Sequence, residues 1–242
     1  MNKVVIALSG GMDSATLCAY YINKNFSVFP ISFEYGSKHN KYERQAALLL
    51  CDYWNLDLKL ISLNFISDLF ESNLLLKGGD IPEGHYESKN MSKTVVPGRN
   101  VIFASIMMGY AWSIGANTIA LGVHAGDHTI YEDCRAGFIS AMNAAVINGS
   151  GDRVRLEAPF LYMNKTDILK IGYGFGYNFD FSLVPYRLTR TCYKDQELSC
   201  GKCGACQERL EAFSNIGIKD PIQYEPVSYK LSDLESIHER EI

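Results

Sequence analysis

Six consecutive residues near the start of the chain have the composition of a phosphate-binding loop. The run is Ser9-Gly10-Gly11-Met12-Asp13-Ser14. Its two glycines let backbone N–H groups approach an anion closely, and a helix beginning here adds a partial positive charge. Ser9 and Ser14 can donate hydroxyl hydrogen bonds, and Asp13 can bind a Mg²⁺ ion that bridges phosphates. The simpler alternative is an ordinary glycine-rich turn between a strand and a helix.

The loop also lacks the lysine that a Walker loop places on the β- and γ-phosphates, so transfer of the γ-phosphoryl group is disfavoured. The pattern S-G-G-x-D-S directly after a first strand resembles the pyrophosphate-binding motif of N-type ATP pyrophosphatases. Those enzymes have an adenine nucleotide α-hydrolase fold, attack the α-phosphate of ATP and release pyrophosphate. The resemblance implies that the ATP-binding residues are Leu8, Ser9, Gly10, Gly11, Met12, Asp13 and Ser14.

Four cysteines near the C-terminus form a second group that could do chemistry: Cys192, Cys200, Cys203 and Cys206. Four thiolates suit tetrahedral Zn²⁺ in a closed structural site, which has no open position for catalysis. An Fe–S cluster is the main alternative, and a disulfide or no ligand is the remaining one. Cys18, Cys51 and Cys134 are isolated in sequence, and we expect them to be small buried residues.

Strands and helices alternate along most of the chain, and they must position these groups. Hydrophobic patterning predicts strands at 3–8, 27–33, 58–63, 117–123 and 154–158. It predicts helices at 13–25, 39–54, 100–114, 135–147, 164–177 and 206–213, with Asn164 and Asp167 capping the fifth. This order predicts an α/β fold, a Rossmann-like doubly wound parallel sheet with helices on both faces.

We expect two parts in the chain. Residues 1–180 would form the α/β ATP pyrophosphatase domain, and residues 181–242 a small zinc-binding segment and tail. The polar, glycine-rich stretch 77–96 is long for a loop inside a compact domain, which predicts a flexible lid or a binding segment.

Composition excludes several classes of protein. The chain of 242 residues is 47% hydrophobic, which argues against a disordered protein. Its net charge of −4 provides no basic field for duplex nucleic acid, so no stable nucleic-acid partner is expected. No apolar run is long enough to span a bilayer, and we expect a cytoplasmic protein.

Further motifs, in order and at matching spacing, narrow the resemblance to the family of QueC-type 7-cyano-7-deazaguanine synthases over residues 3–224. They are 34–39 with Glu43, Val96-Pro97-Gly98-Arg99-Asn100, Tyr131-Glu132-Asp133-Cys134-Arg135, Ala158-Pro159-Phe160 with Lys165, and the cysteine segment through Asp220-Pro221. The sequence departs from the family pattern at Glu132, where proline is usual, and at Thr189-Arg190-Thr191, where a Trp-Ser pair is common.

The resemblance implies ATP-dependent conversion of 7-carboxy-7-deazaguanine and free ammonia to the 7-nitrile. The carboxylate would be adenylated and converted to an amide, and a second ATP would activate the amide oxygen, with AMP and pyrophosphate released. It also implies Mg²⁺, one Zn²⁺ per chain and a homodimer.

Roles follow as hypotheses. The catalytic residues would be Asp13, Lys165 and Arg99, with Lys165 neutralising phosphate charge. Arg99 can bind a carboxylate or phosphate through two hydrogen bonds, and a guanine-like edge requires a carboxylate acceptor. The substrate-binding residues would be Arg99, Glu132, Asp133, Arg135 and His39. Either carboxylate could instead cap the helix that follows it, expected at 135–147. His124 could be packed or catalytic, and Asp127 and His128 are weaker candidates.

Three alternatives stay open. A relative could stop at the amide or attach the activated acid to DNA or protein, which the departures from the family pattern motivate. A tRNA thiolase with an Fe–S cluster would use the same loop and cysteines. A nucleotide-binding module without turnover would keep only the fold.

Overall fold

The computed structural model describes residues 2–124, 126, 130–175 and 184–226. Its centre is a five-stranded sheet in which all neighbouring strands are parallel. The strands are β1 (Lys3–Ala7), β2 (Ser27–Glu34), β3 (Lys59–Ser62), β4 (Thr118–Ala120) and β5 (Arg155–Glu157), in the order β3-β2-β1-β4-β5. The predicted α/β parallel sheet is confirmed. Among the described helices, none has the length and apolar character needed to cross a bilayer.

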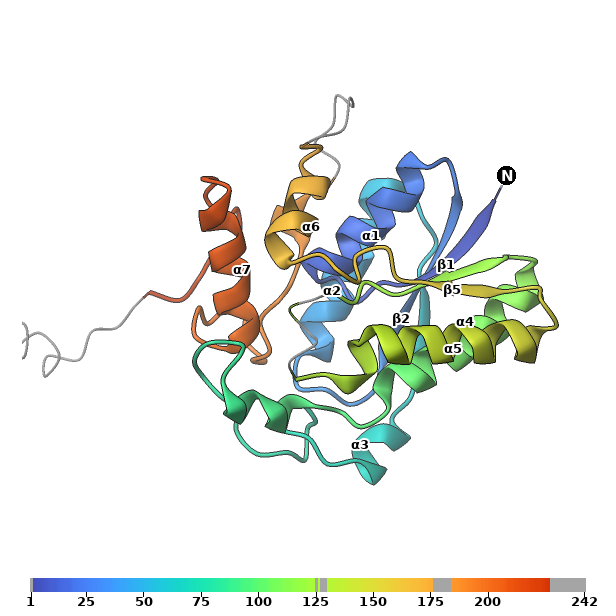
Figure 1. The fold of residues 1–242 in the computed structure, drawn as a ribbon. Coiled ribbons are helices and arrows are strands. Elements are labelled where there is room, and N and C mark those ends of the chain that lie inside the picture. Colours follow the sequence, from blue (N-terminus) through green and yellow to red (C-terminus); the bar gives the residue numbers. More distant parts are fainter. Residues whose placement is uncertain (1, 125, 127–129, 176–183, 227–242) are drawn as a thin grey trace, which may run out of the picture.

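Helices cover both faces of this sheet (Figure 1). They are α1 (Met12–Asn23), α2 (Asn40–Trp54), α3 (Phe65–Leu69), α4 (Arg99–Ile114), α5 (Ala136–Ser150), α6 (Lys165–Gly172) and α7 (Gly204–Asn215). On one face, α1 packs on β1 and β2, α2 on β2, α6 on α1 and α7 on α6. On the other face, α4 packs on β1 and β4 and lies beside α5, which packs on β5.

The alternation of side chains along β1 divides the hydrophobic core into two layers. Val4 and Ile6 belong to the layer under α1 and α6, whereas Val5 belongs to the layer under α4 and α5. All three are fully buried. A central parallel strand is covered on both faces, which is why this segment is a continuous apolar run.

Helix ends follow the expected local chemistry. The predicted cap of α6 is confirmed, because the Asp167 N–H donates to Asn164 Oδ1 at 2.9 Å and the Asn164 N–H donates to Asp167 Oδ2 at 3.2 Å. The same helix was predicted to run to residue 177, and this was wrong for its described part. It ends at Gly172, and Gly174 then takes a φ of +74°, which breaks the helical path.

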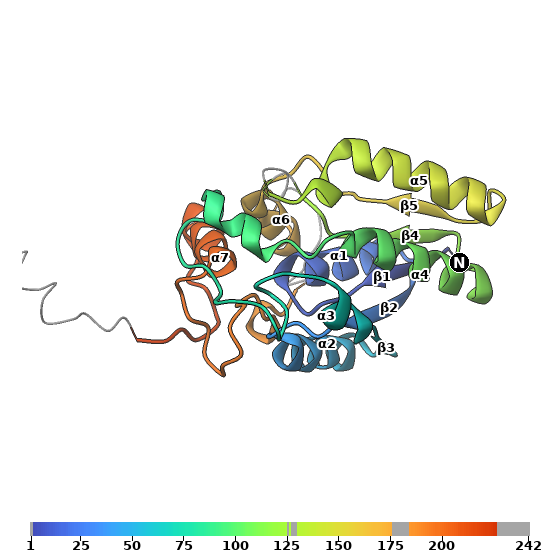
Figure 2. The same cartoon turned by 90° about the horizontal axis from the view of Figure 1, so that it is seen from below.

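The predicted lid, 77–96, lies against the cysteine segment at one end of the molecule (Figures 1 and 2). The Gly84 N–H donates to the Lys202 carbonyl at 3.0 Å. Lys194 Nζ forms an ion pair with Glu83 Oε1 at 2.5 Å. A 3₁₀ helix, Lys89–Thr94, buries Met91 within this stretch. Sequence patterning did not predict that turn or α3, since both are too short to show a helical period.

Candidate active site and cysteine centre

The main pocket lies beyond the carboxyl ends of β1, β2 and β4. The strand order reverses between β1 and β4, and open α/β sheets bind ligands at such a point. The pocket has a volume of about 220 Å³. Its wall includes the glycine loop, the ends of β2 and β4, the start of α6 and residues of the cysteine segment. Elements far apart in sequence therefore meet at one site.

The glycine loop forms the wall of the pocket next to α1. Gly10 has a φ of +88°, and a Cβ atom there would lie 2.6 Å from the Glu43 carbonyl oxygen, so only glycine fits. Ser9 Oγ accepts from the Gly11 N–H at 3.3 Å, and Ser14 Oγ lies 3.2 Å from Ser9 Oγ. Leu8 buries its side chain in the core. All seven predicted loop residues except Gly10 line the pocket.

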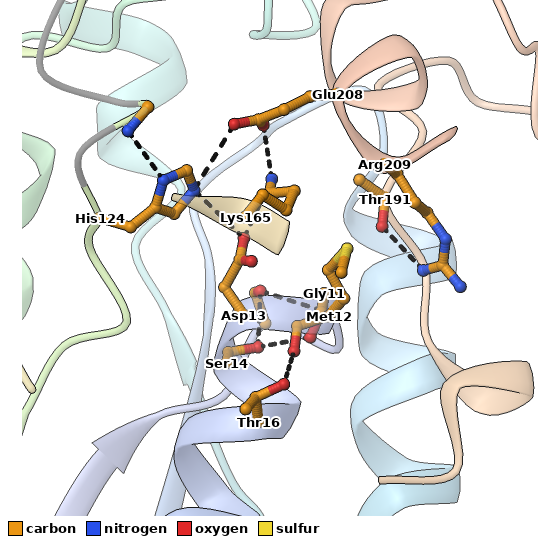
Figure 3. Close-up of polar contacts among 12 residues, drawn as sticks. Gly11, Met12, Asp13, Ser14, Thr16, His124, Lys165, Thr191, Glu208 and Arg209 are labelled. Atoms are coloured by element: carbon orange, nitrogen blue, oxygen red, sulfur yellow. Dashed lines mark hydrogen bonds and ion pairs between the residues drawn. The ribbon is translucent and has the colours of Figure 1, made fainter. Parts of the chain in front are cut away.

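Four ionisable side chains meet beside this loop (Figure 3). Lys165 Nζ lies 2.6 Å from Glu208 Oε2 and 3.2 Å from Asp13 Oδ2. His124 Nε2 lies 3.7 Å from Asp13 Oδ2 and 3.9 Å from Glu208 Oε1. The structure thus brings together the predicted pair Asp13 and Lys165, and it adds Glu208 from α7 and His124 from beyond β4.

The charges in this cluster keep Asp13 ionised. Burial opposes ionisation of its carboxyl group, but the charge of Lys165 and the contact with His124 hold the pKa of Asp13 well below its usual range. His124 Nδ1 accepts from the Gly126 N–H at 3.1 Å, so the ring proton of the neutral imidazole is on Nε2, facing the carboxylates. Asp13 Oδ1 is buried and has no hydrogen-bond partner among the described residues, and such a carboxylate oxygen suits a bound cation.

A second group of polar side chains lines the pocket beyond β2. Arg99 Nη1 donates to the Tyr35 hydroxyl at 3.3 Å. His39 Nε2 lies 3.5 Å from Glu43 Oε2. Burial, with Arg99 and Arg190 nearby, lowers the pKa of His39 to about 3. Burial raises the pKa of Glu43 to about 8, although the same two guanidinium groups oppose the shift.

Three predicted substrate residues do not line this pocket. Glu132 and Arg135 are exposed. Asp133 Oδ2 accepts the Asn100 N–H at 3.0 Å, and the Asp133 carbonyl accepts from Asn100 Nδ2 at 3.0 Å. Asp133 therefore caps α4 and not the helix that follows it, which was the alternative considered, and a substrate role for these three residues stays a prediction. Asp127 and His128 lie outside the described residues.

The four clustered cysteines form a compact buried centre. Their Sγ atoms all lie within 4.8 Å of one another. Cys200 Sγ and Cys206 Sγ are 3.9 Å apart, far beyond the ~2.05 Å of a disulfide and close to the ~3.8 Å edge of a ZnS₄ tetrahedron. The Lys194 N–H donates to Cys192 Sγ at 3.4 Å, and the Cys203 N–H donates to Cys200 Sγ at 3.3 Å. Such contacts favour the thiolate form of the two cysteines. The donor set fits a metal ion, and the prediction that these four residues gather is confirmed.

Cys18, Cys51 and Cys134 are buried, as expected.

A buried arginine fixes the cysteine segment to the rest of the protein. Arg209 is fully buried and binds both carboxylate oxygens of Asp220, at 2.7 and 2.9 Å. Its Nη1 donates to the hydroxyls of Thr189 and Thr191 at 2.6 and 3.0 Å (the Thr191 contact is drawn in Figure 3). The two threonines that depart from the family pattern are therefore the acceptors for a structural guanidinium group.

Glu208 and Arg190 were not predicted as site residues, and Glu43 was predicted only as part of a motif. Glu208 occurs two residues after Cys206, and Arg190 two residues before Cys192. Both line the pocket because the cysteine centre places their segment there. Position next to a metal ligand was the one available signal, and it could not reveal the direction of the side chains.

A parallel sheet with a glycine loop at its switch point, beside a buried lysine–carboxylate cluster, defines a nucleotide-binding protein of the α/β class. The family model described as queuosine biosynthesis protein QueC matches residues 3–217. The chain belongs to the QueC family.

Two relatives show how far the similarity extends. The 7-cyano-7-deazaguanine synthase of Caldicellulosiruptor saccharolyticus is 44% identical over 92% of this chain and 96% of that protein. The 7-cyano-7-deazaguanine synthase of Methanoregula boonei is 45% identical over 93% of this chain and 100% of that protein. Among solved structures, NMN synthetase from Francisella tularensis matches 98% of this chain and 84% of that one, at 17% identity and a TM-score of 0.48. That last likeness is too weak to bear on function.

Proposed function

We propose that this protein converts 7-carboxy-7-deazaguanine and ammonia to 7-cyano-7-deazaguanine in two ATP-dependent steps, releasing AMP and pyrophosphate. The observation that carries the proposal is similarity to synthases of that name along nearly the whole chain. The polar cluster of Asp13 and Lys165 beside the glycine loop supports it, since adenylation needs phosphate groups held in place and their charge neutralised.

The glycine loop would hold the pyrophosphate of ATP. Its backbone N–H groups and the hydroxyls of Ser9 and Ser14 line the pocket at the start of α1. Lys165, only 7% exposed, would neutralise charge as pyrophosphate leaves. Asp13 would hold Mg²⁺ through Oδ1, which has no hydrogen-bond partner in the part of the chain that the structure describes, and that ion would supply further charge neutralisation on the phosphates. Catalysis would then rest on positioning and electrostatics.

Arg99 would hold the substrate carboxylate or the α-phosphate. It lines the pocket and contacts Tyr35 through one Nη1 bond, with the guanidinium group 5.9 Å from the centre of the Tyr35 ring. A planar guanidinium group can present two parallel N–H donors to a carboxylate. His39 would line the same part of the site. The substrate carboxylate would become an acyl adenylate, which ammonia converts to the amide.

We also propose that the four cysteines hold one structural Zn²⁺, with residues 181–242 as the metal-binding part beside an α/β domain of 1–180. The sulfur positions suit a closed tetrahedral site, whose contribution is to folding. Elemental analysis tests this, since iron and sulfide in place of zinc would favour the Fe–S thiolase alternative. A homodimer in the cytoplasm is also proposed, and light scattering on the purified protein tests the dimer.

The decisive test is a product assay. The purified protein is incubated with 7-carboxy-7-deazaguanine, ATP, Mg²⁺ and ammonium, and products are weighed by mass spectrometry. We expect a nitrile, with AMP and pyrophosphate released. A product that stays at the amide mass would instead support the relative that stops there. Absence of both products, with no substrate-dependent pyrophosphate, would refute the proposal.

A further inference from the structure

The pocket contains a carboxyl group that adenylation does not use. Asp13, Glu43 and Glu208 are the carboxyl-bearing residues among the described lining. Asp13 and Glu208 are both ion-paired with Lys165. Within the described part of the chain, Glu43 has only His39 within ion-pair distance, at 3.5 Å. Its side chain is 18% exposed and faces the pocket, so it can both contact a ligand and exchange protons with water.

We propose that Glu43 is the general base for the two nitrogen-transfer steps and that His39 positions it. This inference rests on the proposed function and deepens it. The reaction requires such a base, because ammonia enters with three N–H bonds and the nitrile nitrogen keeps none. Asp13 and Glu208 are poor candidates for that base, since both carboxylates are ion-paired with Lys165.

The proton count defines what Glu43 would do. In the first step, the ammonia lone pair forms a C–N bond at the acyl carbon, the C–O bond to AMP breaks, and AMP leaves with its electron pair. Glu43 takes one proton from the nitrogen, giving the neutral amide. In the second step, the amide oxygen attacks the α-phosphorus of another ATP and pyrophosphate leaves. The nitrogen then gives up two protons in turn, the last as its N–H electrons form the C≡N bond and AMP departs. Glu43 passes each proton to solvent before accepting the next.

The surroundings of Glu43 suit this task. The charged or titratable groups near it are His39 on its own helix end, Arg99 on α4, Arg190 in the cysteine segment and Tyr35 after β2. Burial keeps His39 neutral, so it can donate one hydrogen bond without fixing the carboxylate as an ion pair. Burial also places the pKa of Glu43 at about 8, near the pH at which a base is most effective.

The test separates adenylation from nitrogen transfer. Glu43→Gln is mixed rapidly with ATP, Mg²⁺, 7-carboxy-7-deazaguanine and ammonium, and pyrophosphate and amide are followed together. We expect a pyrophosphate burst of about one equivalent per site at near wild-type rate, because the acyl adenylate forms and then waits. Amide formation should fall by about 100-fold or more. Wild-type protein that releases no pyrophosphate would refute the proposed function instead, so the two failures are distinguishable.

Controls on the same helix keep the result specific. Asp52→Asn, an exposed carboxyl at the far end of α2, should leave both rates within about twofold. Glu43→Asp should recover part of the amide rate, which a purely structural role would not predict. His39→Asn should shift the apparent pKa for amide formation and leave the size and rate of the pyrophosphate burst close to those of wild type. The rate at a fixed concentration of un-ionised ammonia should rise with pH through about 8 in wild type and not in Glu43→Gln.

Two outcomes overturn the inference. One is amide formation by Glu43→Gln within about threefold of wild type, which would show that no base is missing. The other is equal loss of the burst and of amide formation in a variant that is still folded by circular dichroism, which would place Glu43 in ATP or substrate binding.

Discussion

The Lys165 ammonium group lies 2.6 Å from the Glu208 carboxylate, and this contact joins the start of α6 to α7 across the active-site pocket. Lys165 would act on the phosphates of ATP, whereas Glu208 lies two residues beyond Cys206. The part of the chain that carries the four cysteines therefore supplies a wall of the pocket and contacts its buried lysine. We expect changes at the cysteine centre to alter the position of Lys165 in the pocket through its contact with Glu208.

Removing the charge of Glu208 tests this coupling. Glu208→Gln should lower substrate-dependent pyrophosphate release by about tenfold or more, because Lys165 loses the nearer of its two carboxylate partners. Metal content should not change. Glu211→Gln is the matched control, since Glu211 is on the same helix with its side chain 49% exposed, and its rate should stay within about twofold. Equal rates for Glu208→Gln and wild type would show that the contact is dispensable.

Loss of the metal should destabilise the protein as well as the site. Cys203→Ser removes one ligand from a centre whose four side chains are all buried, and a strong chelator would remove the metal ion itself. We expect the free energy of unfolding to fall by several kcal/mol, since metal binding stabilises only the folded segment. Thermal unfolding and elemental analysis measure this. Cys51→Ser, outside the centre, should retain one metal ion per chain, and a metal-free Cys203→Ser variant with wild-type stability would contradict the prediction.

The glycine loop should not tolerate a side chain at residue 10. Gly10→Ala places a Cβ atom 2.6 Å from the Glu43 carbonyl oxygen at a φ of +88°. We expect a loss of about 1–3 kcal/mol in stability and at least tenfold weaker ATP binding, measured by denaturation and calorimetry. In Gly109→Ala, in the exposed middle of α4, the new Cβ atom meets no described atom within 4 Å beyond the neighbouring helix backbone, so the change should stabilise the protein by about 0.5–1 kcal/mol. Equal effects of the two substitutions would refute this account.

Removing one partner of the buried pair Arg209 and Asp220 should strongly destabilise the described C-terminal segment. Asp220→Asn leaves the Arg209 charge buried without its anion, so we expect a loss of about 3–5 kcal/mol in chemical denaturation. An exposed pair offers the comparison. Arg44→Gln breaks the contact with Glu34 at 2.9 Å, where the side chains are 46% and 29% exposed, and should cost less than about 1 kcal/mol. A small effect of Asp220→Asn would mean that the segment is held by other contacts.

Stability should depend on pH through Glu43 and His39 in opposite directions. The folded pKa of Glu43 is raised to about 8, so the native state holds more protons than the unfolded state between about 4.5 and 8, and stability falls as pH rises there. The folded pKa of His39 is lowered to about 3, so its contribution rises with pH between about 3 and 6.5. Of these two contributions to stability, that of Glu43 is the one that still changes above pH 6.5. In urea denaturation, the free energy of unfolding of Glu43→Gln should rise relative to that of wild type between pH 6.5 and pH 8.5. A difference between the two proteins that is the same at both pH values would contradict the raised pKa of Glu43.

Local patterns predicted the sheet and the glycine loop because both are short-range features. A β-branched run such as 4–6 must be a buried strand, and the two glycines after Ser9 allow only a tight turn into a helix. The capping pair Asn164 and Asp167 is likewise a local signal that the structure reproduces. The four cysteines were found from their spacing alone.

The carboxylates of the site were harder to predict because their placement depends on tertiary packing. Asp133 was favoured for its sequence neighbours, but it caps α4 through Asn100, a contact between residues 33 positions apart. Glu208 reaches Lys165 only because α7 packs on α6. No local pattern carries that information. The stretch 77–96 is similar, since its contact with the cysteine segment joins two parts of the chain that are more than 100 residues apart.

The position of Glu208 also has a consequence for the order of events on the ribosome. All five strands, the glycine loop and Lys165 are synthesised before α7 emerges. A nascent chain that has reached only α6 could already form the sheet, but its buried lysine would have no partner from the cysteine segment, and 77–96 would have no surface to dock on. Domains generally fold as units during synthesis, so a site that needs two parts of the chain is complete only after the later part has emerged. For this protein the later part is the segment that carries the four cysteines, so we expect chains that end after α6 to lack the complete pocket.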